Sequence, residues 1–319
     1  MEKRLFFIII IALIIILIVA TSFWLVFLPA EPLIKKEVIF SVEKGGGLKE
    51  IAFNLEKENL IRWAPAFMAY VLVKGIAGGL KSGEYILSPS MNIPQIADKL
   101  FRGDVIKERI TIIEGWSLRD IGFYFENKGM FRVEEVWQMA MKDFSNDFDF
   151  LKDKPENLGL EGYLFPDTYE IRKNEGLENI IKRMLNNFGR RLTPDLREEI
   201  KRQNRTIFEI VTMASMIERE VRKKEDKKLV SGILWKRLKI GMPLQVDATI
   251  AYILGRENWT FDEMRREIAL GRDIDSPYNT YKYRGLPLGP ISNPGLERKA
   301  ANTGIIYPLR KEKLFSAKP

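Results

Sequence analysis

The amino-acid sequence predicts an α+β protein with a single N-terminal transmembrane helix, a small α/β module and a mainly helical domain that carries a small sheet. Three observations lead to this fold class. An uncharged apolar run fills most of the first thirty residues, β-like runs alternate with amphipathic helices in the next hundred, and helical patterns dominate thereafter. The expected parts are a cytoplasmic tail at 1–4, an anchor at 5–29, a module at 37–140 and a second domain at 145–319.

The predicted anchor runs from Leu5 to Leu28, 24 residues without a charge. At about 1.5 Å per residue this helix spans the roughly 30 Å hydrocarbon core of a bilayer. The alternative is a cleaved signal peptide, but the apolar region of a signal peptide runs only about 7–15 residues. Lys3 and Arg4 favour a cytoplasmic N-terminus, which would place residues 30–319 on the outer face of the membrane.

The composition restricts the chemistry that the chain can perform. Its 319 residues include no cysteine and no histidine, which excludes disulfides, Ser-His-Asp triads and zinc sites with Cys or His ligands. The net charge is +8. Because the expected topology argues against nucleic acid, the charge suits anionic lipid headgroups or a carboxylate-bearing cell-wall polymer. A solvated surface rich in lysine would account for the charge equally well.

The module at 37–140 contains a short internal repeat. Residues 44–62 align without gaps to residues 114–132, and six of the nineteen positions are identical at an offset of 70. Each copy follows a β-like run, so the pattern predicts a repeated strand–turn–helix unit. Ser117 and Asp120 have the spacing of a capping box at the start of the second helix. Strands are expected at 38–42, 83–87 and 109–113, with helices near 48–60, 67–76 and 93–101.

Two acids stand out in the predicted helix from Glu209 to Arg222. At about 100° per residue, Glu218 and Glu220 fall on opposite edges of its apolar stripe, so they do not form one pair. Either carboxyl could lie half-buried at the floor of a cleft, where desolvation would keep it protonated near neutral pH, as a general acid for glycosidic cleavage requires. On periodicity alone, an ordinary glutamate at the edge of a buried face is the simpler interpretation.

Three other segments have the composition of binding loops. The segment 160–169 combines acids with aromatic residues, which is typical of sugar-binding surfaces, although its Pro-Asp-Thr is also a common turn. The stretches 276–281 and 285–295 are rich in turn-forming residues, aromatic rings and amides. They could bind a ligand or act as rigid connectors.

Four segments together resemble one protein family. They are LEGYLFPDTYEI, VTMASMIEREV, RLKIGMPLQVDATIAYILG and SPYNTYKYRGLPLGPISNPG, and they occur in this order. In this order they are similar to the signature segments of the endolytic murein transglycosylases, also called the YceG-like family, over roughly residues 37–300. The resemblance implies a LysM-like module at 37–140 and a catalytic domain at 145–319. It also implies a bacterial inner-membrane location, peptidoglycan strands as substrate and cell-wall synthesis proteins as further partners.

The resemblance implies a lyase that needs no metal and no cofactor. One glutamate protonates the oxygen that links N-acetylmuramic acid to N-acetylglucosamine, then accepts the proton of the muramic C6 hydroxyl as that hydroxyl closes a 1,6-anhydro ring. The motif Ala-Ser-x-Ile-Glu-x-Glu assigns this role to Glu220, with Glu218 as runner-up. The same segments imply substrate-binding residues, namely Glu161, Tyr163, Asp167, Gln245, Tyr278, Asn279 and Tyr281.

The chain departs from the family pattern in two places. Val221 follows Glu220 where lytic transglycosylases generally have Ser or Thr. The similarity also fades after Gly295, and the basic tail that follows is shorter than expected, which would leave a strand edge unpaired. The alternative function is therefore a peptidoglycan-binding or scaffold protein without catalytic activity.

Overall fold

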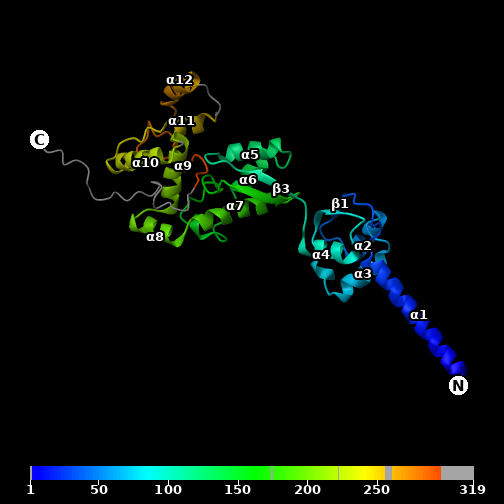
Figure 1. Ribbon diagram of the computed structural model, residues 1–319. Helices are drawn as coiled ribbons and strands as arrows, with labels where there is room; N and C mark the ends of the chain where they lie inside the picture. The colour runs from blue at the N-terminus through cyan, green and yellow to red at the C-terminus, as the bar shows by residue number, and fades with distance from the viewer. Residues whose placement is uncertain (1, 174, 222, 256–260, 296–319) are drawn as a thin grey trace. The chain divides into compact units, whose positions relative to one another are not determined.

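The computed structural model describes residues 2–173, 175–221, 223–255 and 261–295 (Figure 1). The chain forms two compact units, which are described separately below. Unit 1 comprises Met1–Arg109 with Glu170–Asn174, and unit 2 comprises Ile110–Tyr169 with Glu175–Pro319.

Unit 1 begins with helix α1, Glu2–Phe27. Its segment Phe6–Phe27 is long and apolar enough to cross a membrane, and none of it is buried inside the protein. A water-exposed helix with this composition would be unfavourable, because large apolar side chains such as Phe6 and Leu17 face outward along its whole length. The helix therefore fits the expected membrane anchor.

The rest of unit 1 packs four helical segments against a two-stranded sheet. Strands β1, Val38–Val42, and β2, Gly83–Leu87, pair antiparallel, with Phe40 opposite Tyr85. The packed segments are α2 (Leu48–Lys57), α3 (Ala64–Val73), the 3₁₀ turn η1 (Ala77–Gly79) and α4 (Ile93–Arg102). Leu55, Phe67 and Leu100 are fully buried in the core between them. The alternation of Val38 to Val42 thus acts as predicted: one face of the strand enters the core and the other stays open.

The two copies of the sequence repeat adopt the same local structure. The second copy starts after β3, Lys107–Thr111, and forms α5, Leu118–Asn127. Gly45 and Gly115 occupy equivalent turn positions with φ of 88° and 83°, a region that only glycine enters without strain. The predicted strand–turn–helix unit is therefore present twice.

Unit 2 is mainly helical, with one small sheet in which β3 pairs with β4, Thr168–Arg172. The residues of both strands are divided between the two units. The helical segments are α5, α6 (Val133–Ala140), η2 (Asp149–Leu151), α7 (Leu177–Arg191), α8 (Pro194–Arg202), α9 (Ile207–Glu220), α10 (Lys224–Lys239), α11 (Asp247–Leu254) and α12 (Phe261–Gly271). Phe150, Tyr163 and Phe188 form an aromatic cluster in its core, with ring centroids 4.9–6.2 Å apart.

The packing divides the chain at Arg109, whereas the sequence suggested a boundary near residue 140. The helix of the second repeat copy, α5, packs against α6 and donates the N–H of Leu118 to Glu161, while Trp116 just before it accepts from Asn293, so this copy is part of the core of unit 2. The two repeat copies were placed in one module because their sequences are similar, but tertiary contacts determine the unit to which each copy belongs. Strand β4 lies where the sequence suggested mostly helix.

Candidate active site

Helix α9 carries both candidate acids in its last turn. Thr206 caps its start, accepting the backbone N–H of Glu209 while the Glu209 carboxylate accepts that of Thr206. From Ile210 to Ile217 every residue is buried, including Thr212 and Ser215. The helix ends at Glu220, where Val221 turns to an extended backbone. The buried stretch fixes the helix, so the two acids that follow it are held in defined positions.

Glu218 is a buried, paired carboxylate. Its side chain is 7% exposed, its Oε1 lies 2.5 Å from Lys227 Nζ, and its Oε2 accepts the backbone N–H of Gly295 at 3.3 Å. Burial raises the pKa of Glu218 above its ordinary value, and nearby Glu114 raises it further, while Lys227 and Gly295 oppose this shift. Glu218 thus joins α9, α10 and the end of the 285–295 loop.

Glu220 has a different environment. Its side chain is exposed, and one carboxylate oxygen accepts the backbone N–H of Ala248, in the first turn of α11, at 3.2 Å. The surrounding protein mass desolvates the carboxyl and raises the pKa of Glu220, as does the charge of Asp247, while the hydrogen bond from Ala248 opposes the shift. The two acids therefore have separate partners, as their opposite positions on the helix predicted. Glu220 is the one whose carboxyl is accessible from solvent.

A cleft of about 300 Å³ lies elsewhere in unit 2. The start of α5, α6, the 160–169 segment, α11 and the 276–281 loop contribute to its walls. Three aromatic rings line it, and the rings of Tyr252 and Tyr278 lie 5.0 Å apart. Concave sites with aromatic walls and a few polar groups are the usual form of ligand sites. The lining residues with the most distinctive chemistry are Ser117, Arg119, Trp137, Glu161, Tyr252 and Tyr278.

Glu161 forms the polar floor of this cleft. It is 7% exposed, and both of its oxygens accept the backbone N–H of Leu118, at 3.1 and 3.0 Å. Asn293 Nδ2 donates to it at 3.1 Å and the Tyr252 hydroxyl at 3.4 Å. Because Leu118 is the first residue of α5, the carboxylate also lies at the positive end of the helix dipole. These contacts hold the carboxyl group in a fixed place, which suits Glu161 to positioning.

Arg119 is the cation of the cleft. No carboxylate among the described residues forms an ion pair with it. Its guanidinium lies so close to Gly255 that a Cβ on that glycine would clash, 1.7 Å from Nη1. Gly255 also ends α11 with φ of 66°. The sequence reasoning missed Arg119, Trp137 and Tyr252, because each occupies an ordinary position of an amphipathic helix and nothing in the pattern marks it as part of a cleft.

The 285–295 loop is held by buried hydrogen bonds rather than by apolar packing alone. Asn293, which is fully buried, accepts the N–H of Leu164 at 2.9 Å and donates to Trp116 O at 2.9 Å. Ser215 of α9 accepts the N–H of Ile291, and Ser292 donates to the Ser215 carbonyl. The loop is thus a rigid connector that brings the signature segments together. Sequence reasoning missed Asn293, although an amide in a Pro- and Gly-rich loop was a visible signal.

The structure distributes the predicted substrate-binding residues over different environments. Glu161 and Tyr278 line the cleft. Tyr163 is fully buried in the aromatic core, away from solvent. Asp167 is partly exposed and accepts from Asn187 and Arg191. Gln245 is exposed, has φ of 55°, and accepts from Arg237 at 3.1 Å.

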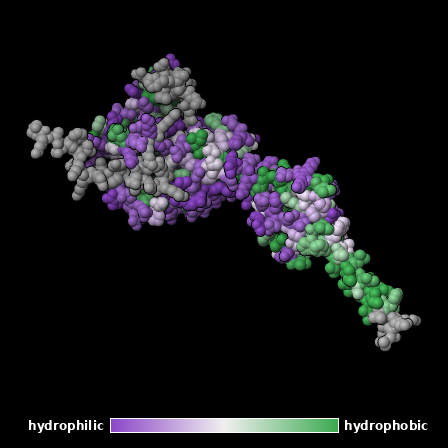
Figure 2. Space-filling model, viewed as in Figure 1, coloured by the Kyte–Doolittle hydropathy of each residue, from purple (hydrophilic) through white to green (hydrophobic). Residues whose placement is uncertain are grey.

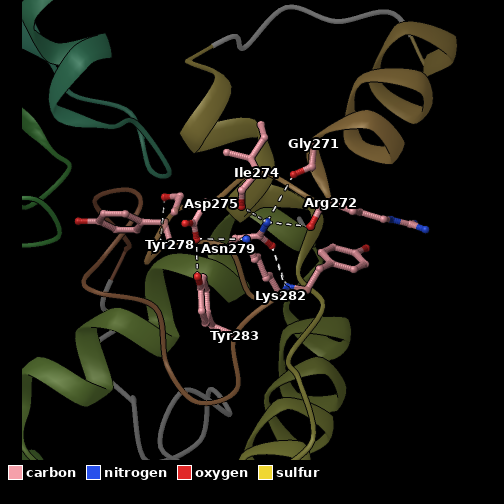
Figure 3. Close-up of polar contacts among 10 residues, drawn as sticks. Gly271, Arg272, Ile274, Asp275, Tyr278, Asn279, Lys282 and Tyr283 are labelled. Carbon is pink, nitrogen blue, oxygen red and sulfur yellow. Dashed lines mark hydrogen bonds and ion pairs between the residues drawn. The ribbon is translucent and has the colours of Figure 1, made fainter.

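Asn279 organises the 276–281 loop (Figure 3). It is 1% exposed; Nδ2 donates to the carbonyls of Gly271, Arg272 and Ile274, while Oδ1 accepts the N–H groups of Tyr281 and Lys282. These contacts fix the loop from inside. They also position Tyr281, whose hydroxyl donates to Asp247. Burial and, to a smaller extent, this hydrogen bond raise the pKa of Tyr281 to about 12. The charge of Asp247 in turn raises the pKa of Glu220. The loop is therefore linked, through Tyr281 and Asp247, to the surroundings of the candidate acid.

Within the residues that the structure describes, there is no cluster of three or more acidic side chains that could hold a metal ion. The arrangement does offer a solvent-accessible carboxyl with a raised pKa, a buried ion pair beside it, and an aromatic cleft with a fixed carboxylate and a guanidinium. These groups are suited to proton transfer and to binding a polar, sugar-like ligand.

Comparison with known proteins identifies the family. The model of the YceG-like family matches residues 40–315, most of the chain. The chain belongs to the YceG-like family. The match extends past Gly295, where the sequence analysis expected it to fade; residues 296–319 lie outside the described part of the chain.

Curated relatives carry the name endolytic murein transglycosylase. One from Streptococcus pneumoniae serotype 2 (strain D39) is 32% identical over 292 residues, covering 85% of this chain and 52% of the relative. Another, from Bacillus subtilis strain 168, is 33% identical over 282 residues, covering 84% and 76%. The chain thus spans about half the length of the pneumococcal relative. A crystal structure of a YceG-like protein from Listeria monocytogenes shares the fold, with a TM-score of 0.52, 29% identity, and coverage of 86% of this chain and 90% of that one.

Proposed function

We propose that this protein is a membrane-anchored lytic transglycosylase that cleaves peptidoglycan between N-acetylmuramic acid and N-acetylglucosamine and leaves 1,6-anhydro ends. Membership of the YceG-like family and the names of the relatives support the reaction class. The observation that carries the proposal is Glu220, a solvent-accessible carboxyl with a raised pKa at the end of a rigid helix.

The mechanism needs a single carboxyl group that first donates and then accepts a proton. Protonated Glu220 gives its proton to the glycosidic oxygen, and the bond from that oxygen to the muramic anomeric carbon breaks. The muramic C6 hydroxyl then attacks the anomeric carbon and loses its proton to the Glu220 carboxylate. Because the substrate supplies the nucleophile, the second carboxylate of a hydrolase is unnecessary.

We assign the role of proton donor and acceptor to Glu220 rather than to Glu218 because their hydrogen-bond partners differ. Glu218 is engaged by Lys227 and by the backbone of Gly295, and removing it from these contacts would leave a partly buried ammonium without its partner. Glu220 has a backbone N–H as its partner, which can orient the carboxyl without holding it ionised as a cation does. We propose that Glu218 positions the end of α9 and the 285–295 loop.

The substrate-binding surface is proposed to include Glu161, Asp167, Gln245, Tyr278, Asn279 and Tyr281. Of these, Asn279 acts from inside the loop by positioning Tyr281, and Tyr163 supports the 160–169 segment from the core. Arg119 and Trp137 extend this surface in the cleft. The aromatic rings are suited to stacking on sugar faces, and the guanidinium to a substrate carboxylate.

Unit 1 is proposed to act as a LysM-like module that binds or positions glycan. The paired strands and packed helices of residues 38–102 support a small α/β module of this kind. The proposed topology has the N-terminus in the cytoplasm and residues 30–319 outside the bacterial inner membrane, where cell-wall synthesis proteins would be further partners. An alkaline phosphatase fusion at the C-terminus should be active, and an inactive fusion would contradict the topology.

The decisive experiment replaces Glu220 with glutamine. Glu220→Gln keeps shape and removes the titrating proton, so release of 1,6-anhydro muropeptides from purified sacculi should fall by about 10²–10⁴-fold. Glu218→Gln should lower it less. The reverse order would assign catalysis to Glu218, and activity in both variants would overturn the assignment. A parent chain that makes no anhydro ends would favour the alternatives instead: binding to sacculi would indicate the peptidoglycan-binding function, and its absence the scaffold function. Melting curves control for folding.

The raised pKa of Glu220 makes a second measurement possible. A general acid works while protonated, so the alkaline limb of the pH profile of kcat/KM should lie above the ordinary glutamate value of 4.5. A raised pKa means that the folded state binds this proton more tightly than the unfolded chain. The resulting stabilisation is fully present below 4.5 and is lost as pH rises through the folded-state pKa. The difference in unfolding free energy between Glu220→Gln and the parent should therefore change with pH only between 4.5 and the folded-state pKa of Glu220.

A further inference from the structure

Helix α3 of unit 1 has an apolar outer face. Its ten residues, APAFMAYVLV, include no charged side chain. One side is buried in the unit through Ala64, Phe67 and Val71. On the other side Leu72 is 62% and Val73 87% exposed. A surface helix of a water-soluble domain normally turns polar residues outward, and a helix that is apolar all round is normally covered on every side.

The position of α3 indicates what covers it. Helix α1 packs against α3 and α4. Arg62, next to the start of α3, donates to the carbonyl of Leu28 at 3.0 Å, and its guanidinium lies 4.3 Å from the centre of the Trp24 ring. Asn92, the cap of α4, donates to the carbonyl of Phe27 at 3.2 Å. Since these contacts fix the end of α1 to unit 1, a bilayer that α1 crosses would end beside α3.

We propose that α3 lies in the interface of the same bilayer that α1 spans, with Leu72 and Val73 inserted among the lipids. At about 1.5 Å per residue, α3 is about 15 Å long, too short to cross the membrane, so it lies along the surface. Arg62 and Lys74 flank its two ends, where their charged groups reach the headgroups. Trp63 is the N-cap residue of α3 and the Trp24 ring contacts the neighbouring Arg62, and tryptophan is enriched at this interface. Figure 2 shows hydrophobic residues continuing from α1 onto the adjoining part of the unit.

This inference rests on the proposed membrane anchoring and adds a second point of contact. An anchor of one helix leaves a domain free to rotate and tilt above the bilayer. A second apolar element beside the anchor fixes the orientation of unit 1 relative to the membrane plane. Leu33, five residues beyond Leu28 and 95% exposed, lies within reach of the same surface.

The absence of cysteine from the sequence makes a site-specific test direct. The full chain is reconstituted into vesicles with a single introduced cysteine that carries an environment-sensitive fluorophore, and the vesicles contain lipids with nitroxide quenchers at known depths. Val73→Cys tests α3. Ile14→Cys reports on α1. Ile39→Cys is the matched control, because Ile39 is 64% exposed and lies in β1, away from α1 in Figure 1.

The proposal predicts a depth for each label. The label at position 73 should be quenched best by shallow nitroxides, about 5–10 Å into the membrane, the label at 14 by deep ones, and the label at 39 by neither. Quenching at 14 without quenching at 73 would overturn the interfacial position of α3 and leave the anchor standing. Shielding of position 73 from aqueous iodide without lipid quenching would replace the membrane by a protein partner or a second copy. No quenching at 14 would overturn the anchor and this inference together.

Discussion

The two copies of the repeat have one backbone design and two different surroundings. Each has a ten-residue helix after a turn that contains a glycine with positive φ. Each helix also ends in the same way, because Leu60 N donates to Leu55 O and Met130 N donates to Phe125 O. The donors and the acceptors of these two bonds are equivalent at the offset of 70 residues. Even the residue with positive φ after the helix recurs, as Asn59 in one copy and Gly129 in the other.

The copies differ at the start of the helix. In the first, Gly47 precedes α2 and supplies no side-chain cap. In the second, Ser117 and Asp120 form a capping box, and the carboxylate of Glu161 occupies the helix N-terminus from a distant segment. The repeat therefore supplies only a scaffold. The candidate cleft arises where other signature segments pack against the second copy.

Removal of the Glu161 carboxylate should lower the unfolding free energy more than any other substitution at the two repeat copies. Glu161→Leu would leave the buried N–H of Leu118 without its acceptor and would leave the side-chain amide of Asn293 with the Trp116 carbonyl as its remaining acceptor. Because an unsatisfied buried donor costs about 1–3 kcal/mol, unit 2 should lose about 3 kcal/mol of unfolding free energy. Urea unfolding followed by tryptophan fluorescence measures the change.

The matched control lies in the first copy. Glu50 is exposed in the first turn of α2, so Glu50→Leu should change stability by less than about 0.5 kcal/mol. Equal effects of the two substitutions would show that Glu161 is not a structural clamp on α5, and the distinction between the copies would fail.

Local patterns predicted the scaffold well because its determinants are local. Strand β2 lies at residues 83–87 as predicted, and the capping box of Ser117 is present. The opposite placement of Glu218 and Glu220 also followed from helical periodicity. The membership of α5 in unit 2 did not follow from local patterns, because it depends on contacts between residues far apart in the sequence. Leu118 contacts Glu161, 43 residues away, and Trp116 contacts Asn293, 177 residues away.

The cleft was the least predictable part for the same reason. Arg119 and Lys49 occupy equivalent positions of the two copies, and both look like solvated cations in the sequence. Trp137 on α6 and Tyr252 on α11 become wall residues only when five segments converge. The small sheet of this domain was expected without a place for its strands, and the alternating burial at 168–172 is that of a half-buried strand. Pairing with β3 decides its structure.

A second prediction compares the two cations. Arg119→Gln should raise the KM for sacculus-derived glycan by about tenfold, because a charge-assisted hydrogen bond is worth about 1.5–3 kcal/mol, whereas kcat should change little. Lys49→Gln is the control, since that exposed side chain lies outside the cleft residues. An unchanged KM for Arg119→Gln, or equal changes of KM in both variants, would contradict the proposal that the cleft binds the glycan.

The weakest effects should come from single substitutions at the N-cap residues of the two repeat helices, Ser117 and Gly47. Ser117→Ala removes the hydroxyl that accepts the N–H of Asp120, so unit 2 should lose about 1 kcal/mol of unfolding free energy. In the opposite direction, Gly47→Ser should gain a few tenths of a kcal/mol, because φ of −78° and ψ of 157° suit serine and nothing lies within 4 Å of the added Cβ. Chemical denaturation of both variants and of the double variant gives the two changes and their sum. The sites belong to different units, so the effects should be additive within about 0.5 kcal/mol. A loss of stability for Gly47→Ser would show that glycine is required at the first copy for a reason other than backbone geometry, and the two helix starts would then not be equivalent.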